Sequence, residues 1–160
     1  MNPFNQFYSD RNGKYRIRWQ QPDKSMLLGR DTTRNLVVTR EIDEATTNLD
    51  LHLRPGLAIA GVLQDQSGMP ATNARVSLHM RLADAGAELA KTTTDKHGAY
   101  AFSALPAEGE YSLDVGTEHS DTRGSWGILR VKGGETNLVL RLTSPLANYD
   151  SAQLPLEREH

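Results

Sequence analysis

Apolar and polar residues alternate along most of this chain. In the stretch VSLHM, residues 76–80, the apolar Val76, Leu78 and Met80 share one face. A period of two places successive side chains on opposite faces of a β-strand, whereas an amphipathic helix needs a period near 3.6, which no segment here sustains. The alternation therefore predicts an all-β chain whose strands bury one face.

Polar turn signals cut the alternating pattern into short strands. They are DQSGMP (65–70), DKHG (95–98), LPAEGE (105–110) and KGGE (132–135). Between them, strands are expected near 57–64, 74–81, 89–94, 99–104, 111–117, 126–132 and 136–143. The stretch 81–90 is expected to be a loop rather than a helical turn, because it is short and contains Gly86. Such short, regularly spaced strands are typical of a β-sandwich.

The sequence also contains an internal repeat. TTNLDLHL (46–53) recurs as ETNLVLRL (135–142) at an offset of 136 − 47 = 89 residues, and DRNGKYRI (10–17) recurs as DKHGAYAF (95–102) at 95 − 10 = 85. The chain is therefore expected to divide into three parts. Residues 1–54 are the C-terminal half of one repeat, residues 55–143 are a complete repeat, and residues 144–160 are a tail or the first strand of a following repeat.

The half-repeat is expected to form strands near 13–19, 25–30, 35–41 and 47–53. It lacks its first three strands, so its apolar faces and sheet edges need a cover. We expect that cover to come either from docking against the complete repeat or from strand exchange with a second copy of the chain.

Composition narrows the range of partners. Eighteen basic and twenty acidic residues give a formal net charge of −2, which calls for neither nucleic acid nor an anionic membrane. There is no cysteine, which excludes disulfides and thiol chemistry. No apolar run approaches the roughly 18 residues of a membrane span, and the N-terminus has no signal-peptide core, so an export signal is expected outside this chain.

Two longer stretches resemble the carboxypeptidase regulatory-like domain, a transthyretin-like β-sandwich. They are GVLQDQSGMPATNARVSL and TTTDKHGAYAFSALPAEGEYSLDV, within residues 57–143. The family's pattern falls on Gly61, Asp65, Gly68, Pro70, Ala74, Val76, Thr94, Asp95, Gly98, Tyr100, Phe102, Leu105, Pro106, Gly109 and Tyr111. The resemblance implies a seven-stranded Greek-key sandwich. Residues 1–54 resemble the second half of such a domain, in the style of tandem-repeat envelope proteins of planctomycete-like bacteria.

The function implied by this resemblance is not enzymatic. It is that of a structural spacer or protein-interaction domain in a larger exported bacterial protein, at the cell surface, in the periplasm or secreted. Neighbouring repeats, or another copy of the chain, are the expected partners. The alternative is a carbohydrate-binding module, similar to starch-binding domains, that stacks a glycan on an exposed Trp126; Trp19 is expected to face a core instead.

Asp95 and His97 stand two apart beside Gly98 and suggest a metal or catalytic pair. Calcium would need several more oxygen ligands, and zinc would need more His or Cys. The first repeat keeps the aspartate and glycine as Asp10 and Gly13 and has no histidine. The stretch is therefore interpreted as a turn in which the aspartate accepts backbone amides and the glycine takes a positive φ.

A third turn of this kind is expected at Asp65, Gly68 and Pro70. No catalytic residue, metal site or cofactor is expected anywhere in the chain, since there is no G-x-S-x-G and the five histidines lack metal-ligand spacing. One covalent alternative stays open, an isopeptide crosslink between Lys91 and Asn137, which would require a buried lysine.

Overall fold

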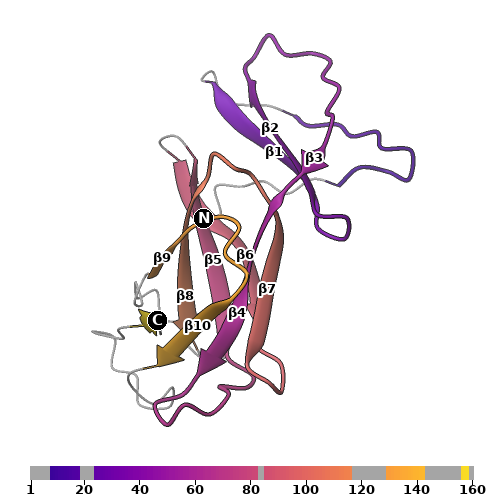
Figure 1. Ribbon diagram of the computed structural model, residues 1–160. Helices are drawn as coiled ribbons and strands as arrows, with labels where there is room; N and C mark the ends of the chain where they lie inside the picture. The colour runs from indigo at the N-terminus through magenta and orange to yellow at the C-terminus, as the bar shows by residue number, and fades with distance from the viewer. Residues whose placement is uncertain (1–7, 19–23, 83–84, 117–128, 143–155, 159–160) are drawn as a thin grey trace.

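The computed structural model describes residues 8–18, 24–82, 85–116, 129–142 and 156–158, and within them every regular element is a β-strand (Figure 1). The strands are β1 (Ser25–Asp31), β2 (Leu36–Ile42), β3 (Arg54–Pro55), β4 (Leu57–Gln64), β5 (Arg75–Leu82), β6 (Ala85–Thr93), β7 (Ala99–Leu105), β8 (Glu110–Gly116), β9 (Leu129–Val131), β10 (Leu138–Leu142) and β11 (Leu156–Arg158). The prediction of an all-β chain is confirmed.

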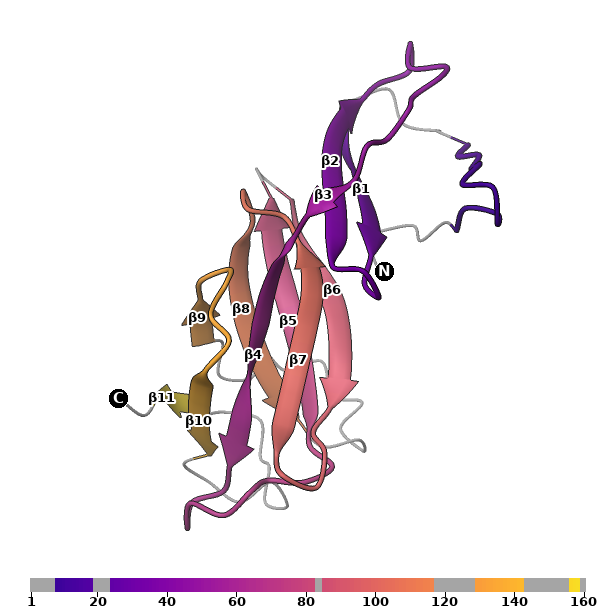
Figure 2. The same cartoon turned by 45° about the vertical axis from the view of Figure 1, so that its right-hand side comes forward.

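The strands form three sheets. Two four-stranded sheets, β11-β10-β4-β7 and β6-β5-β8-β9, pack face to face as a β-sandwich, and Figure 2 shows β4, β7 and β10 in front of β5, β6 and β8. A smaller sheet, β1-β2-β3, lies at one end of the sandwich. Strand β4 is central to its sheet, because it pairs in parallel with β10 and antiparallel with β7.

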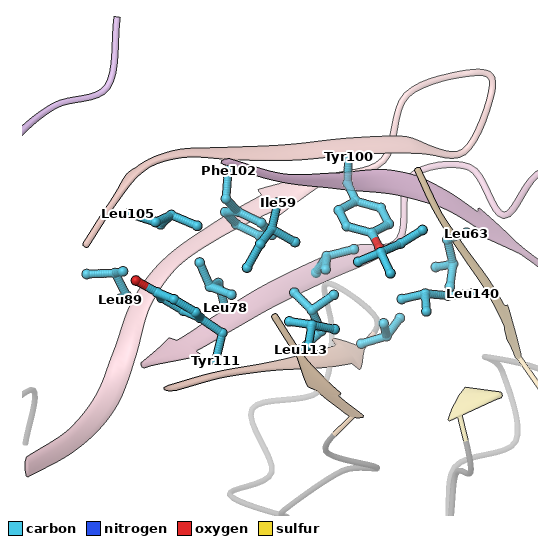
Figure 3. Packing of buried hydrophobic residues seen from close by; sticks show 14 of the residues in the cluster. Ile59, Leu63, Leu78, Leu89, Tyr100, Phe102, Leu105, Tyr111, Leu113 and Leu140 are labelled. Carbon is cyan, nitrogen blue, oxygen red and sulfur yellow. The ribbon is translucent and has the colours of Figure 1, made fainter. Parts of the chain in front are cut away.

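The hydrophobic core lies between the two four-stranded sheets. Figure 3 shows Ile59, Tyr100 and Phe102 on one side facing Leu78 and Leu113 on the other. All five side chains are 5% exposed or less. Burying each large apolar side chain contributes roughly 1.5–3 kcal/mol, so the alternating residues account for most of the stability of the sandwich.

The prediction of a loop at residues 81–90 is wrong. Strand β5 continues to Leu82, β6 begins at Ala85, and the two pair as a hairpin. The register shifts between Leu78 and His79, which is where Leu89 enters the core. This bulge breaks the period-two pattern of β6, and the broken pattern is why the stretch does not look like a strand in the sequence.

Two expected strands of the half-repeat are also absent. The hairpin of β1 and β2 forms, with Ser25 opposite Ile42 and Asp31 opposite Leu36, but neither 13–18 nor 47–53 is a strand. Their counterparts in the complete repeat are β7 and β10, which both pair with β4. Alternation alone does not make a strand, since neither segment pairs with another strand among the described residues.

Candidate functional site

The turn at residues 95–98 is held by the side chain of Asp95. Its Oδ1 accepts the backbone amides of His97 at 2.8 Å and Ala99 at 2.9 Å, and Gly98 has a φ of 71°. The amides of Ala99 and His97 hold the pKa of the Asp95 carboxyl below its usual value. The carboxyl oxygen is thus engaged with backbone donors, and the His97 side chain is exposed.

The same construction occurs at the two other turns. Asp10 and Asp65 each accept, through Oδ1, the amides two and four residues further on at 2.8–3.0 Å. Gly13 and Gly68 follow at the same place, with φ values of 77° and 82°. Pro70 forms an isolated bridge with Gln64 just after the third turn. The three turns have the same pattern of hydrogen bonds and the same positive φ at the glycine, and they present no common ligand site.

Thr94, directly before the Asp95 turn, holds the loop that leads into β5 at two points. Its side chain is 4% exposed. The hydroxyl donates to the Ala71 carbonyl at 2.7 Å and accepts the Ala74 amide at 2.9 Å. Because the buried hydroxyl both donates and accepts a hydrogen bond, it holds this loop in place beside the end of β6.

The side chain of Tyr111 closes the other end of the sandwich. Its hydroxyl donates to the carbonyl oxygen of Pro106, five residues earlier. Burial raises the pKa of Tyr111 well above its ordinary value, and the nearby Arg30 opposes that shift. The phenol therefore stays protonated and acts as a hydrogen-bond donor.

The N-terminal hairpin is joined to the sandwich beside this tyrosine, through Arg30. Its guanidinium donates to the carbonyl oxygen of Ala104 at 3.0 Å, of Ser103 at 2.7 Å and of Leu89 at 3.5 Å. Burial lowers the pKa of Arg30. The cation is held by backbone dipoles of β6 and β7, so it positions the hairpin on both sheets of the sandwich.

Asn35, in the turn between β1 and β2, completes the junction between the hairpin and the sandwich. Its Oδ1 accepts the Ala104 amide at 2.7 Å, and its Nδ2 donates to the Gly56 carbonyl at 2.8 Å. Ala104 has a φ of 56°, a left-handed conformation that is unfavourable for a residue with a Cβ. Arg30 and Asn35 bind the carbonyl and the amide of that residue, and Leu28 packs against the core of the sandwich.

Sequence reasoning missed this junction, although it left a signal. Arg30 continues the face formed by Met26 and Leu28, and by the offset of 85 residues it corresponds to Val115, which is buried. A charged residue on the apolar face of a strand indicates a contact that a hydrophobic side chain cannot make. Nothing in the sequence marks Asn35 as its partner.

Asp114 is another polar group that the sequence does not reveal. It lies on β8 opposite Ser77 of β5, on the face turned away from the core. Burial raises its pKa to about 6, while Arg75 acts in the opposite direction and Glu88 in the same one. Its Oδ1 has no hydrogen-bond partner. This carboxyl is therefore a source of pH dependence in the stability of the fold.

The remaining predicted residues do not gather into a site. Trp126 and Trp19 both lie outside the described residues. Lys91 of β6 and Asn137, just before β10, belong to different sheets and are both exposed, so an isopeptide crosslink is excluded. Within the described ranges, no group of three or more His, Cys, Asp or Glu residues could hold a metal ion. The same residues include no helix long and apolar enough to cross a membrane.

Comparison with known proteins identifies one family. The sequence profile of the carboxypeptidase regulatory-like domain matches residues 58–143. A search of curated proteins finds no match. Among solved structures, a 9R-lipoxygenase from Cyanothece PCC8801 is 18% identical, with a TM-score of 0.38, over 68% of this chain and 20% of the lipoxygenase. This chain therefore spans about a fifth of that protein's length, and a TM-score this low does not indicate a shared fold.

Proposed function

The chain belongs to the carboxypeptidase regulatory-like domain family, and we propose that it serves as a rigid spacer between repeats of a larger exported bacterial protein. Members of this family contribute a non-catalytic β-sandwich. The observation that carries the proposal is the junction at Ala104, where Arg30 and Asn35 of one repeat bind the backbone of the next. A spacer must transmit orientation from one repeat to the next, and a junction of directed hydrogen bonds does so.

The proposal includes the finer architecture. Strands β4–β10 constitute one transthyretin-like Greek key, and residues 1–54 constitute the C-terminal half of a preceding repeat of the same kind. The recurrence of the Asp10 turn in the Asp95 turn, with the same two amide contacts, supports the repeat. Residues 55–143 are the complete domain, and residues 144–160 are a tail or the start of a third repeat.

The setting of the protein follows from the family resemblance. We assign the array to the periplasm, the cell surface or the medium, in the manner of tandem-repeat envelope proteins. Its partners are neighbouring repeats or another copy of the chain. The carbohydrate-binding alternative depends on Trp126, and no described residue favours it.

The test is whether the hairpin and the sandwich tumble as one body. NMR relaxation of backbone amides should give β1 and β2 the same rotational correlation time as β4–β10. Arg30→Ala should shorten the correlation time of the hairpin alone. Arg34→Ala is the matched control, because Arg34 lies in the same hairpin, is 72% exposed in its side chain and pairs only with Asp31. A hairpin that tumbles independently in the unmodified chain would refute the spacer.

A further inference from the structure

The two edge strands beside the N-terminal hairpin each contain a β-bulge. β6 and β7 are the last strands of their sheets and lie side by side at one edge of the sandwich (Figure 2). In β7, Ser103 and Ala104 together stand against the single Ala58 of β4. In β6, Leu89 is the extra residue at the register shift of its pairing with β5. Because a bulge leaves its extra residue out of the ladder, both edge strands offer backbone groups at this height.

The backbone carbonyls of both bulges converge on one group, the guanidinium of Arg30. Its Nε donates to the Ala104 carbonyl at 3.0 Å, its Nη2 to the Ser103 carbonyl at 2.7 Å, and its Nη1 to the Leu89 carbonyl at 3.5 Å. The first two distances are those of ordinary hydrogen bonds, and the third is at the outer limit. The three carbonyl oxygens are called the carbonyl site below. Each of its oxygens accepts from a different nitrogen of the same planar group.

The carbonyl site belongs to the sandwich rather than to the hairpin. All three acceptors are main-chain atoms, and the bulges that present them lie in strands that pair with β4 and β5. The side chains of Leu89 and Ala104 are buried, and Leu89 is part of the sandwich core. The packing of the sandwich therefore fixes the acceptors, and we expect them to keep their places when the Arg30 side chain is removed.

The carbonyl site distinguishes cations by their shape. Arg30 takes part in neither of the ion pairs found among the described residues, so carbonyl dipoles alone hold its charge. A guanidinium carries five N–H donors in a planar fork, whereas an ammonium carries three donors on one nitrogen. A single nitrogen cannot stand where three nitrogens of Arg30 stand. The site is therefore expected to bind a guanidinium in preference to an ammonium.

We propose that the carbonyls of Leu89, Ser103 and Ala104 form a binding site for one alkylguanidinium group, and that the ligand is an arginine side chain presented by a β-hairpin. Here Arg30 supplies it. The site gives the sandwich a means of recognising the unit that precedes it, through backbone atoms that every substitution on the surface leaves in place.

The hairpin contacts around Arg30 favour an arginine side chain over a free guanidinium compound. Asn35 of the same hairpin accepts the Ala104 amide at 2.7 Å, next to the carbonyl that Arg30 binds. Leu28, two residues before Arg30 on β1, packs against the sandwich core. An arginine in such a strand is held at a high effective concentration, which a free molecule lacks. That this hairpin belongs to a neighbouring repeat is the part that rests on the proposed function.

The test removes the arginine side chain and returns the missing part as a free molecule. Arg30→Ala deletes Cγ, Cδ and the guanidinium, which together correspond to ethylguanidinium. The full-length variant is titrated with ethylguanidinium into the tens of millimolar, where its denaturing effect is small, and NMR follows the carbonyl-carbon chemical shifts. We expect saturable shifts at Leu89, Ser103 and Ala104, in the direction of the unmodified chain. No saturable shift at these carbonyls would overturn the proposal.

Matched controls separate the guanidinium group from charge and from ionic strength. Ethylammonium should bind Arg30→Ala about fivefold more weakly or worse, and sodium chloride should give no saturable shift at these carbonyls. Arg34→Ala should show no saturable shift with ethylguanidinium, because Arg30 still fills the site and the exposed Arg34 pairs with Asp31. An equal response to ethylammonium, or an equal response in Arg34→Ala, contradicts a guanidinium site.

Two further measurements do not require Arg30→Ala to fold well. Arg30→Lys keeps the charge, and we expect its hairpin to lose the rotational correlation time of the sandwich; a hairpin that stays attached would show that charge suffices. In the unmodified chain, scalar couplings across the hydrogen bonds should join the Arg30 guanidinium nitrogens to the carbonyl carbons of Ser103 and Ala104. Their absence in a chain that tumbles as one body would contradict the site.

The source of the ligand and the spacer are tested separately. Ethylguanidinium at the same concentrations should not release the hairpin of the unmodified chain, because the tethered Arg30 competes at a higher effective concentration. Release would assign the site to a free guanidinium compound and overturn the arginine ligand. If the unmodified hairpin tumbles independently while Arg30→Ala still binds ethylguanidinium, the spacer is refuted and the binding site stands.

Discussion

Replacing Gly98 with alanine should destabilise the sandwich far more than the same change at Gly13. Both glycines follow an aspartate-centred turn with nearly equal φ, 71° and 77°, so both substitutions carry a left-handed penalty of about 1–2 kcal/mol. Only at Gly98 does the new methyl group meet the backbone. It would come closer than 3.0 Å to the Leu63 carbonyl and within 3.4 Å of the Ala71 amide nitrogen.

The additional cost at Gly98 follows from what must move. Leu63 is 0% exposed and donates its amide to the Gly98 carbonyl, so relief of the overlap shifts a core strand and stretches that bond. Overpacking of this kind costs about 1–3 kcal/mol. The total loss in the free energy of unfolding is then about 2–5 kcal/mol, which for a domain of about 90 residues lowers Tm by roughly 8–40 °C.

The assay is thermal and urea unfolding of the two variants, followed by far-UV circular dichroism. We expect Gly13→Ala to lose only the left-handed penalty of about 1–2 kcal/mol, because its added methyl group is in open space. If Gly98→Ala loses no more stability than Gly13→Ala, the overlap with Leu63 is not what constrains this position, and the reasoning is wrong.

Two further predictions concern buried polar groups. Thr94→Val keeps the shape of the side chain but leaves the Ala71 carbonyl and the Ala74 amide without their partner, so urea unfolding should show a loss of about 2–4 kcal/mol, against a smaller loss for Thr94→Ser. The pKa of Asp114 is raised from 3.8 to about 6 in the folded chain, which therefore binds a proton more tightly than the unfolded chain. The stability that this carboxyl contributes is complete below about pH 4 and is lost as the pH rises through about 6. Asp114→Asn should exceed the unmodified chain in urea midpoint at pH 7.5, and the difference should shrink toward pH 4; a difference independent of pH would contradict the assignment.

The strands of the sandwich were predictable because their information is local. Alternation and turn residues place β4, β7 and β8 within a residue of their observed bounds. The start of β6 was not predicted because the extra residue at the bulge, Leu89, interrupts the period-two pattern of that strand. The prediction of strands at 13–18 and 47–53 fails for the opposite reason. Their local pattern is strand-like, but the partner that would complete the ladder is not among the described residues.

The candidate junction was less accessible to sequence reasoning. Arg30 could be noticed as a charge on an apolar face, yet its acceptors are backbone carbonyls 59 to 74 residues further along the chain. Backbone groups have no signature in a sequence, because every residue carries them. The same holds for Ala104, whose left-handed conformation is visible only in the folded chain.

The central position of β4 also sets the order in which the sandwich can be assembled during synthesis. Gly61 pairs with Tyr100, 100 − 61 = 39 residues later, but its other neighbour, Leu138, follows only after 138 − 61 = 77 residues. A growing chain can therefore form the hairpins of the second sheet while one edge of β4 still lacks hydrogen bonds. Non-local pairing of this kind slows folding and leaves an open edge available to other strands. Until residues 138–142 have been made, the unpaired edge of β4 can capture a strand from a neighbouring chain in place of β10.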